Sequence, residues 1–354
     1  MNYLIVQQWP STKGNHAGMC HMCDMLVSLY PNQYKKIELE DLLFIPQRRF
    51  FLTSLLFSKF DQWRYTRNFH KKQLAKIRDT LHNLKDNDKI FLLEYHLLQV
   101  DQIYLAKYLK KHYPTIRRIG LSHLTPSNLI ASGFTKEKII EWSNAIDLQL
   151  TLGSSLSYYF ESIGIPKDKI RTGFHYVDGG YYKPNSSVSQ NTRPTAIAMG
   201  NLQRNYQLLA NIVQETQCVD WIICCGNNYS EIHSLFKPSA NLQLKKHLPE
   251  AKLKELMDQA DISVNVLDDT VGSNVITTSM AMGLAMVASD VGSIRDYCDE
   301  SNCIFCKNTV DDFKKNINNL ASDIKLTKQM QQSSLEKSQK FKIENIHRWF
   351  NQLE

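Results

Sequence analysis

A Gly-Ser-Asn turn late in the chain has residue types that bind phosphate. The apolar run 262–266 predicts a strand before this turn, and the pattern 275–282 predicts a helix after it. Backbone N–H groups at such a helix start, together with the positive end of the helix dipole, attract an anion. Gly272 allows the backbone to approach closely, while Ser273 and Asn274 can cap the helix or donate to phosphate oxygens. The turn therefore predicts a phosphate site, although an ordinary helix cap has the same residues.

The eight cysteines include two Cys-x-x-Cys pairs, Cys20 with Cys23 and Cys303 with Cys306. Four thiolates would suit a structural zinc ion. However, the pairs lie far apart in apolar, periodic sequence, and free cysteine is among the most buried residue types. We therefore expect small core residues in a reducing compartment rather than a metal site.

The segment 44–78 combines nine Lys and Arg with eight Phe, Trp and Tyr and one acidic residue. This mixture suits an anionic membrane surface. It also suits single-stranded nucleic acid, but no nucleic-acid-binding motif accompanies it, so no nucleic acid is expected. A pair of ordinary helices with buried rings explains it equally well. Residues 1–184 carry 25 Lys and Arg against 16 Asp and Glu, and the remainder 17 against 19, which indicates an anionic partner for the first half.

Short apolar runs alternate with amphipathic helical patterns in the first half of the chain. A polar, glycine-containing loop at 9–18 follows the first run. The predicted strands are 3–6, 89–94, 118–122, 148–152 and 170–174, and the predicted helices are 22–29, 102–112 and 155–163.

The polar stretch 185–194 has no apolar periodicity and is predicted to be a linker. Two successive α/β units predict an α/β protein of two doubly wound Rossmann-like domains, 1–184 and 195–340, with ligands bound in a cleft between them. The alternation resumes after the linker with strands at 196–199, 221–225, 262–266 and 286–289 and helices at 206–215, 252–260, 275–282 and 343–353.

The composition fits a folded protein of two domains. A chain of 354 residues with 43% apolar and 22% charged residues is not typical of a disordered protein. No stretch approaches the roughly 20 apolar residues of a membrane helix. The first residues lack the basic region and long apolar core of a signal peptide, so we expect a cytoplasmic protein.

The segment 268–292 resembles the donor-binding core of GT-B glycosyltransferases, in particular the retaining glycosyltransferase family 4, or glycosyl transferases group 1. In that family a strand, a glycine-bearing loop and a helix precede an Ala-Met-Ala-x-Gly stretch, a strand and a Gly-Gly-type turn. The last three features match 280–283, 284–289 and 290–294. The resemblance implies the GT-B architecture, with two Rossmann-like domains facing a central cleft and a C-terminal helix, 341–354, that packs back on the first domain.

The resemblance extends over nearly the whole chain. In the crossover between the family's domains an Asp follows a hydrophobic residue and an aromatic residue precedes Pro, which here are Asp178, Tyr182 and Pro184. The first turn of the family's second domain has a basic residue that holds the donor diphosphate, and Arg204 matches it.

In the first half, KGNHAG at 13–18 resembles the family's glycine loop, which approaches the donor phosphate and the acceptor. Gly14 and Gly18 suit a close approach of the backbone, and a plain flexible loop is the alternative. His16 is a candidate contact to acceptor or phosphate, unless it simply faces solvent.

His123 ends the predicted strand 118–122. The family places a histidine after the corresponding strand, near the transferring sugar. The resemblance therefore implies a catalytic role, through hydrogen bonds to sugar hydroxyls or stabilisation of developing charge. A histidine bonded to the backbone is the alternative. Glu94 and His96 also follow a strand end, and we expect a buried structural pair.

One departure concerns a pair of glutamates, eight positions apart, that the family uses for the donor sugar and the ribose. Val271 and Ser279 stand at the matching positions. Asp268 or Asp269 would then accept hydrogen bonds from sugar hydroxyls, and Ser279 would make a weaker ribose contact. The two aspartates fit solvated turn residues equally well.

The resemblance implies a hexosyltransferase that moves a sugar from a nucleoside-diphosphate sugar to a glycan or lipid-linked acceptor. It further implies retention at the anomeric carbon and a role in bacterial surface polysaccharide synthesis, on the inner face of the membrane. Arg204 and the Gly-Ser-Asn turn would stabilise the leaving diphosphate, so no metal or other cofactor is expected. A dehydrogenase is disfavoured because no Gly-x-Gly-x-x-Gly follows a strand. The missing glutamates leave a non-catalytic nucleotide-binding or scaffold protein as the alternative.

Overall fold

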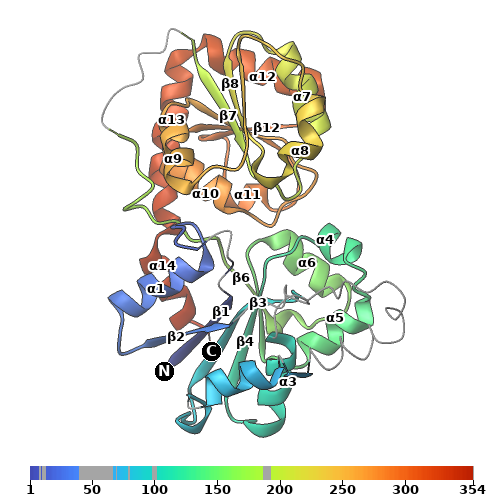
Figure 1. Ribbon diagram of the computed structural model, residues 1–354, viewed down its shortest axis with the longest axis vertical. Coiled ribbons are helices and arrows are strands. Elements are labelled where there is room, and N and C mark those ends of the chain that lie inside the picture. Colours follow the sequence, from blue (N-terminus) through green and yellow to red (C-terminus); the bar gives the residue numbers. More distant parts are fainter. Residues whose placement is uncertain are drawn as a thin grey trace, which may run out of the picture. The chain divides into compact units, whose positions relative to one another are not determined.

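The computed structural model describes residues 1–7, 9, 13–39, 67–68, 70–78, 80–97, 102–185 and 193–353 (Figure 1). These residues form two compact units. The first comprises Met1–Leu152 and Ser157–Thr172, and the second Gly153–Leu156 and Gly173–Glu354. Each unit contains a six-stranded sheet whose neighbouring strands are parallel. The predicted class, an α/β protein of two doubly wound Rossmann-like domains, is confirmed.

The first sheet has the order β2-β1-β3-β4-β5-β6. Its central strands are buried along almost their whole length, because helices cover both faces of a parallel sheet. The strands are β1 (Asn2–Gln7), β2 (Tyr34–Leu39), β3 (Lys89–Tyr95), β4 (Arg117–Ser122), β5 (Leu148–Thr151) and β6 (Ile170–Thr172), and the helices are α1 (Met19–Leu29), α3 (Gln102–His112), α4 (Pro126–Ala131), α5 (Lys136–Ser143) and α6 (Ser154–Ser162).

The second sheet has the order β12-β11-β10-β7-β8-β9. Figure 1 draws α9 and α13 to the left of its strands and α7 and α8 to the right. The strands are β7 (Thr195–Met199), β8 (Asp220–Cys224), β9 (Leu242–Lys245), β10 (Ile262–Asn265), β11 (Ala285–Ser289) and β12 (Cys303–Cys306), and the helices are α7 (Tyr206–Glu215), α8 (Tyr229–Ile232), α9 (Glu250–Asp258), α10 (Asn274–Ala281), α11 (Ile294–Tyr297), α12 (Val310–Ser322), α13 (Ile324–Ser338) and α14 (Ile343–Asn351).

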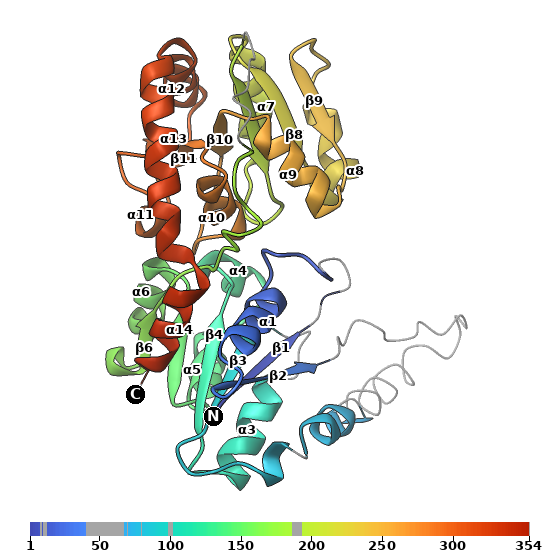
Figure 2. The same ribbon diagram turned by 90° about the vertical axis from the view of Figure 1, so that its left-hand side faces the viewer.

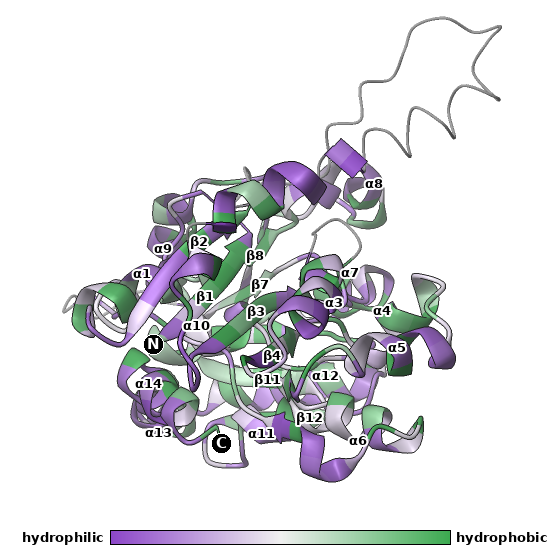
Figure 3. Ribbon diagram, turned by 90° about the horizontal axis from the view of Figure 1, so that it is seen from below, coloured by the Kyte–Doolittle hydropathy of each residue, from purple (hydrophilic) through white to green (hydrophobic). Residues whose placement is uncertain are grey.

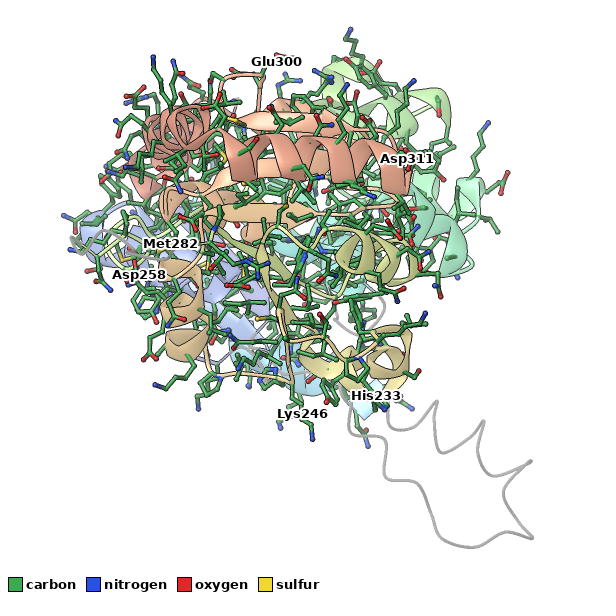
Figure 4. All side chains as sticks on the ribbon, turned by 90° about the horizontal axis from the view of Figure 1, so that it is seen from above. His233, Lys246, Asp258, Met282, Glu300 and Asp311 are labelled. Atoms are coloured by element: carbon green, nitrogen blue, oxygen red, sulfur yellow. The ribbon has the colours of Figure 1, made fainter. Side chains whose placement is uncertain are left out.

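A hydrophobic core joins α7 and α12 to the second sheet. Trp221 of β8 and Phe313 of α12 are fully buried members of it. Figure 3 shows hydrophobic colour along central strands such as β7 and β8 and mixed colour on the helices around them. Exposed charged residues such as Lys246, Glu300 and Asp311 lie at the rim of this unit (Figure 4). This pattern is the one expected of amphipathic helices on a buried sheet.

The C-terminal helix α14 follows α13 (Figure 2) and packs on the crossover segment at the start of the second unit. The ring centroids of Phe174 and Trp349 lie 5.8 Å apart, and Val177 N donates to the Phe341 carbonyl at 2.9 Å. A Cβ on Gly173 would lie 2.1 Å from the Trp349 ring, so only glycine fits there. The sequence assigned this segment to the first domain, up to residue 184. The compact units instead divide at Thr172 and Gly173.

Two segments that the sequence analysis interpreted, 185–194 and 44–78, lie only partly within the described residues. Residues 186–192 of the predicted linker, and 44–66 and 69 of the basic, aromatic segment 44–78, lie outside the described residues. Within the described part of the chain, no helix has both the length and the apolarity needed to cross a bilayer.

The cysteines of the two Cys-x-x-Cys pairs belong to different units. Cys23, Cys303 and Cys306 are buried, as expected of small core residues. Cys20 is only partly buried, and its thiol contacts Lys36 Nζ at 3.7 Å. Burial raises the pKa of the Cys20 thiol to about 11, so this group stays protonated at neutral pH.

Candidate functional site

Arg204 lies in the loop that follows β7, and its side chain crosses over Gly200. A Cβ on Gly200 would lie 2.9 Å from Arg204 Nη2 and 3.2 Å from Val275 Cγ2, in the first turn of α10. Gly200 also has a φ of +96°, which L side chains rarely adopt. This glycine therefore makes room for a guanidinium group next to the start of a helix.

The Arg204 guanidinium carries a positive charge that no described carboxylate neutralises. Its Nε and Nη1 atoms are buried and lack hydrogen-bond partners. Burial lowers the pKa of Arg204 to about 10, so the group remains protonated at neutral pH. A buried cation without a counterion is costly, and a bound anion would remove that cost.

Backbone bonds hold the Arg204 loop against the loop that follows β10. Asn205 N donates to the Val266 carbonyl at 3.1 Å, and Asp268 N donates to the Gln203 carbonyl at 3.0 Å. The Asp268 carboxylate adds a third link, because its Oδ1 accepts from Asn205 Nδ2 at 2.8 Å. Asp268 is exposed, and this oxygen positions the Arg204 loop.

Helix α10 begins at the predicted turn. Ser273 is its N-cap, with Oγ accepting from Ile276 N at 3.4 Å. The Oδ1 atom of Asn274 is buried and without a partner. The first backbone N–H groups of any α-helix lack intrahelical acceptors, so this end offers donors and the positive end of the helix dipole beside Arg204.

The predicted role of Gly272, a close approach to phosphate, stays a prediction, and the structure adds a packing role. Its N–H donates to Thr270 Oγ1 at 3.0 Å and is therefore occupied. Its φ is +88°, and a Cβ would lie 2.2 Å from the ring of Tyr297. The position requires glycine because a core tyrosine packs against it.

Asp269 is bonded within its own turn, with Oδ1 accepting from Thr270 N at 2.8 Å. The neighbouring glycine turn is also close, because a Cβ on Gly292 would lie 2.7 Å from the same oxygen. Ser293 N donates to the Thr270 carbonyl at 2.7 Å. The backbone bond between Ser293 and Thr270 therefore joins the two loops, and the Asp269 carboxylate stabilises its own turn.

Val271 and Ser279 are enclosed, at 2% and 0% exposure. The Ser279 hydroxyl lies 2.9 Å from Ser263 Oγ within the unit. Both side chains are therefore enclosed within the unit, and the predicted ribose contact of Ser279 stays a prediction. The absence of the paired glutamates does not depend on this alignment, because no glutamate occurs between Glu255 and Glu300.

The glycine loop of the first unit leads into α1. Gly14 has a φ of +81° and open space around its Cα, whereas Gly18 is the N-cap of α1 with an ordinary φ of −87°. The His16 ring packs at 4.7 Å from the His21 ring. A glycine is thus required by the backbone at Gly14 but not at Gly18.

His123 follows β4 and its Nε2 lies 2.5 Å from the Leu93 carbonyl oxygen. Because a carbonyl can only accept, Nε2 carries the proton. The same nitrogen is 3.8 Å from Glu94 Oε2, and the His123 side chain is 17% exposed. The Nε2 atom of His123 is therefore bonded to the backbone, as in the alternative interpretation of this residue.

Glu94 and His96 are both buried, but they do not pair with each other. The Trp9 indole hydrogen-bonds the Glu94 carboxylate, and burial raises the pKa of this carboxyl. His96 has a φ of +62°, and its Nδ1 lies 2.6 Å from Ser122 Oγ. Its Nε2 is buried without a partner, and burial lowers the pKa of His96 to about 3.

Sequence reasoning missed two glutamines of the first unit. Gln102 joins the ends of β1 and β3, because its Oε1 accepts from Glu94 N at 2.7 Å and its Nε2 donates to the Ile5 carbonyl at 3.2 Å. Gln7, at the end of β1, is 1% exposed, and both its amide atoms lack partners. The sequence feature that could have indicated Gln7 is a polar residue at the end of a mostly apolar strand.

The predicted residues thus form separate groups within the two units. In the second unit, Arg204 lies beside the start of α10, where Ser273 and Asn274 begin the helix, and Asp268 is bonded to the Arg204 loop. In the first unit, His123 lies beside Glu94, and Gly14, His16 and Gly18 lie in the loop before α1.

Residues 193–323 match the family model described as Glycosyl transferases group 1. Comparison with curated proteins gives no match. The chain is similar in structure to HepE of Anabaena in complex with UDP and glucose, with a TM-score of 0.69, 13% identity, and 99% and 98% of the two chains covered. For sucrose-phosphate synthase of Thermosynechococcus elongatus these values are 0.73, 9%, 100% and 98%. For the lipopolysaccharide outer core galactosyltransferase WaaB they are 0.66, 12%, 100% and 100%.

Identities this low establish a shared fold, and the family match covers the strands and helices that carry Arg204 and the start of α10. Residues 193–323 thus match glycosyl transferases group 1, and the chain as a whole has the fold of these GT-B structures.

Proposed function

We propose that this chain is a glycosyltransferase that uses a nucleoside-diphosphate sugar and binds its diphosphate between the Arg204 guanidinium and the first turn of α10. The observation that carries the proposal is a protonated guanidinium whose buried Nε and Nη1 atoms lack a hydrogen-bond partner, and which Gly200 brings next to a helix start. Both groups favour a negatively charged ligand. A UDP-sugar is the donor that we favour, because the similar HepE has been solved with UDP and with UDP-glucose.

The chemistry follows from the charge that develops on the leaving diphosphate. When the bond between the anomeric carbon and the donor oxygen breaks, negative charge accumulates on that oxygen, and Arg204 and the α10 amides stabilise it. These groups replace a divalent cation in the proposal, so no metal or other cofactor takes part. Asp268 has a second carboxylate oxygen with which it accepts a hydrogen bond from a sugar hydroxyl.

The family resemblance also implies roles for residues of the first unit. His123 is the proposed catalytic residue, which hydrogen-bonds hydroxyls of the transferred sugar. Gly14, His16 and Gly18 contribute the loop that contacts phosphate or acceptor. These roles rest on the family resemblance of the KGNHAG loop and of the strand that ends at Ser122.

The finer function is also a proposal: a cytoplasmic hexosyltransferase that retains the anomeric configuration. Its acceptor is a glycan or a lipid-linked sugar of bacterial surface polysaccharide synthesis. The basic, aromatic composition of 44–78 supports contact with the anionic inner face of the membrane. Cosedimentation with anionic and neutral vesicles at low salt tests that contact, and equal binding to both would exclude a role for anionic lipid.

The absence of a glutamate between Glu255 and Glu300 favours one second candidate, a nucleotide-binding protein without catalysis. Titration calorimetry with UDP, UDP-glucose, UDP-galactose and UDP-N-acetylglucosamine, followed by an assay for released UDP, separates the two. Binding followed by release of UDP supports the enzyme. Binding without release supports the second candidate, and no binding of any nucleotide contradicts the diphosphate site.

A further inference from the structure

Gln7 is an amide side chain that the fold encloses but does not satisfy. It is the last residue of β1, next to β3 in the first sheet. Its side chain is 1% exposed, and neither Oε1 nor Nε2 has a hydrogen-bond partner. An unpaired buried donor or acceptor typically costs about 1–3 kcal/mol. The four preceding residues, 3–6, are buried hydrophobic residues, so an apolar residue at position 7 would have avoided this cost.

The neighbouring strand end carries a second polar group. Ile5 pairs with Leu92, and Gln7 and Glu94 each lie two residues further along, so they reach the same level of the sheet. Glu94 is buried, and the half-buried Trp9 hydrogen-bonds its carboxylate. An amide, a carboxylate and an indole ring therefore border one end of β1 and β3.

Gln102 fixes the backbone of these strand ends. It is fully buried and bonds both the Ile5 carbonyl and Glu94 N. The two glutamines thus have the same side chain and equal burial, but Gln102 is paired with the backbone of the protein and Gln7 is not. The fold itself makes no use of the Gln7 amide.

We infer that Gln7, Glu94 and Trp9 form a sugar-binding subsite, in which the Gln7 amide pairs with two adjacent hydroxyls once the Trp9 side chain yields to the ligand. An amide offers one donor and one acceptor side by side, which matches a pair of neighbouring hydroxyls. A carboxylate accepts from a further hydroxyl, and an indole ring packs on the apolar face of a sugar ring. The inference rests on the proposed sugar transfer and adds the residues that would select the sugar.

The sugar has two possible sources, the donor and the acceptor. Binding of UDP and of UDP-glucose to the wild-type chain and to Gln7→Leu is measured by calorimetry. Binding of methyl α-glucopyranoside and methyl α-galactopyranoside is measured by saturation-transfer NMR. If the donor sugar occupies the subsite, Gln7→Leu weakens UDP-glucose binding by roughly tenfold and leaves UDP binding unchanged. If the acceptor sugar occupies it, the variant loses methyl glycoside binding by a similar factor and keeps both nucleotide affinities.

Thermal stability separates ligand binding from a structural role. Gln7→Leu should keep or raise the melting temperature, because it removes an unpaired buried amide. The matched variant Gln102→Leu should lower it, because it leaves the Ile5 carbonyl and Glu94 N unpaired. A Gln7→Leu variant that melts lower and binds all ligands normally would overturn the inference.

The inference is also overturned if Gln7→Leu binds UDP-glucose and both methyl glycosides as the wild type does, or if the wild-type chain binds UDP but none of the sugars. Failure of the wild-type chain to bind UDP is a different result. It contradicts the diphosphate site of the second unit, while the methyl glycosides still test the subsite of the first.

Discussion

Arg204 is the residue on which the phosphate argument depends most. Replacement by Met retains much of the side-chain volume and removes the charge. We expect UDP affinity to fall by roughly 10- to 100-fold, the usual loss when a charge-assisted hydrogen bond is removed. The melting temperature should stay the same or rise, because a desolvated cation without a partner is removed. Calorimetry and a thermal melt measure the two effects.

Arg295→Met is the matched control for this prediction. Arg295 is exposed in the same unit and pairs with Asp290 at 2.8 Å and with Glu300 at 2.7 Å. Its replacement should leave UDP affinity unchanged. Equal UDP affinity for Arg204→Met and the wild type would remove Arg204 from the diphosphate site.

Gly272 and Gly14 have similar positive φ angles but different surroundings. Alanine variants at these positions therefore separate the cost of backbone conformation from the cost of side-chain packing. Gly272→Ala places a methyl group 2.2 Å from the Tyr297 ring at a φ of +88°, so we expect a loss of about 2–4 kcal/mol in unfolding free energy. Gly14→Ala has a φ of +81° but open space, so it should lose only about 1 kcal/mol. Urea unfolding measures both. Equal losses would show that Tyr297 moves aside freely.

At the scale of single residues, the sequence indicated which positions matter but not which contacts make them matter. The Ser273 cap follows from a local pattern, and the position of Arg204 in the first loop follows from the family resemblance. The need for glycine at 272 arises from Tyr297, which lies far along the chain, and no local pattern shows such a contact. Likewise, the enclosure of Ser279 by Ser263 depends on how α10 packs on β10.

The central strands of the two sheets were all predicted, whereas of the four edge strands only β6 was predicted. The strands β2, β9 and β12, which the sequence analysis did not predict, all lie at sheet edges. Their burial is interrupted, as in β9, where every residue is partly or fully exposed. An edge strand is covered on fewer sides, so it lacks the continuous apolar run that marks a central parallel strand.

His96 links the ends of three strands and should make the first unit sensitive to acid. It lies after β3 and contacts Ser122 of β4, whose Oγ accepts from Gln149 of β5 at 2.9 Å. Its folded pKa of about 3 is below the unfolded value of about 6.5. The unfolded chain therefore binds more protons between these values, and the His96 contribution to stability is lost as pH falls from about 6.5 to 3, by about 1.4 kcal/mol per pH unit.

Urea unfolding at pH 7, 6, 5 and 4 tests this dependence. His96→Asn is the useful variant, because asparagine tolerates the positive φ of this position and does not titrate. The variant should be less stable at pH 7 but should show a smaller decline towards pH 4. Parallel declines in the two proteins would assign the acid sensitivity to other groups.

For the whole molecule, the division into units predicts which fragment folds alone. Fragment 173–354 contains the second unit apart from Gly153–Leu156, so it should unfold cooperatively and bind UDP. Fragment 195–354 begins at the predicted domain start but lacks Phe174, which packs on Phe341 and Trp349. It should melt roughly 6–12 °C lower, because uncovering large aromatic rings costs about 3 kcal/mol.

Thermal melts of the two fragments, with and without UDP, check this prediction. Identical melting temperatures would mean that residues 173–194 add no stability to the second unit. The sequence predicted two doubly wound sheets because the alternation of strands and helices is local. It missed the division at Thr172 and Gly173, because membership of a unit is decided by contacts with the far end of the chain.

The packing of α14 on Gly173 and Phe174 also has a consequence for synthesis on the ribosome. The first strands of the chain find all their sheet partners by Thr172, so the first sheet can assemble early. Phe341 is made roughly 170 residues after Gly173, a delay on the order of 10–30 s at common bacterial and eukaryotic elongation rates. During that interval Trp349 has not been made and cannot cover the crossover segment. The nascent chain therefore has a folded first sheet followed by an aromatic segment that stays uncovered until α14 is synthesised.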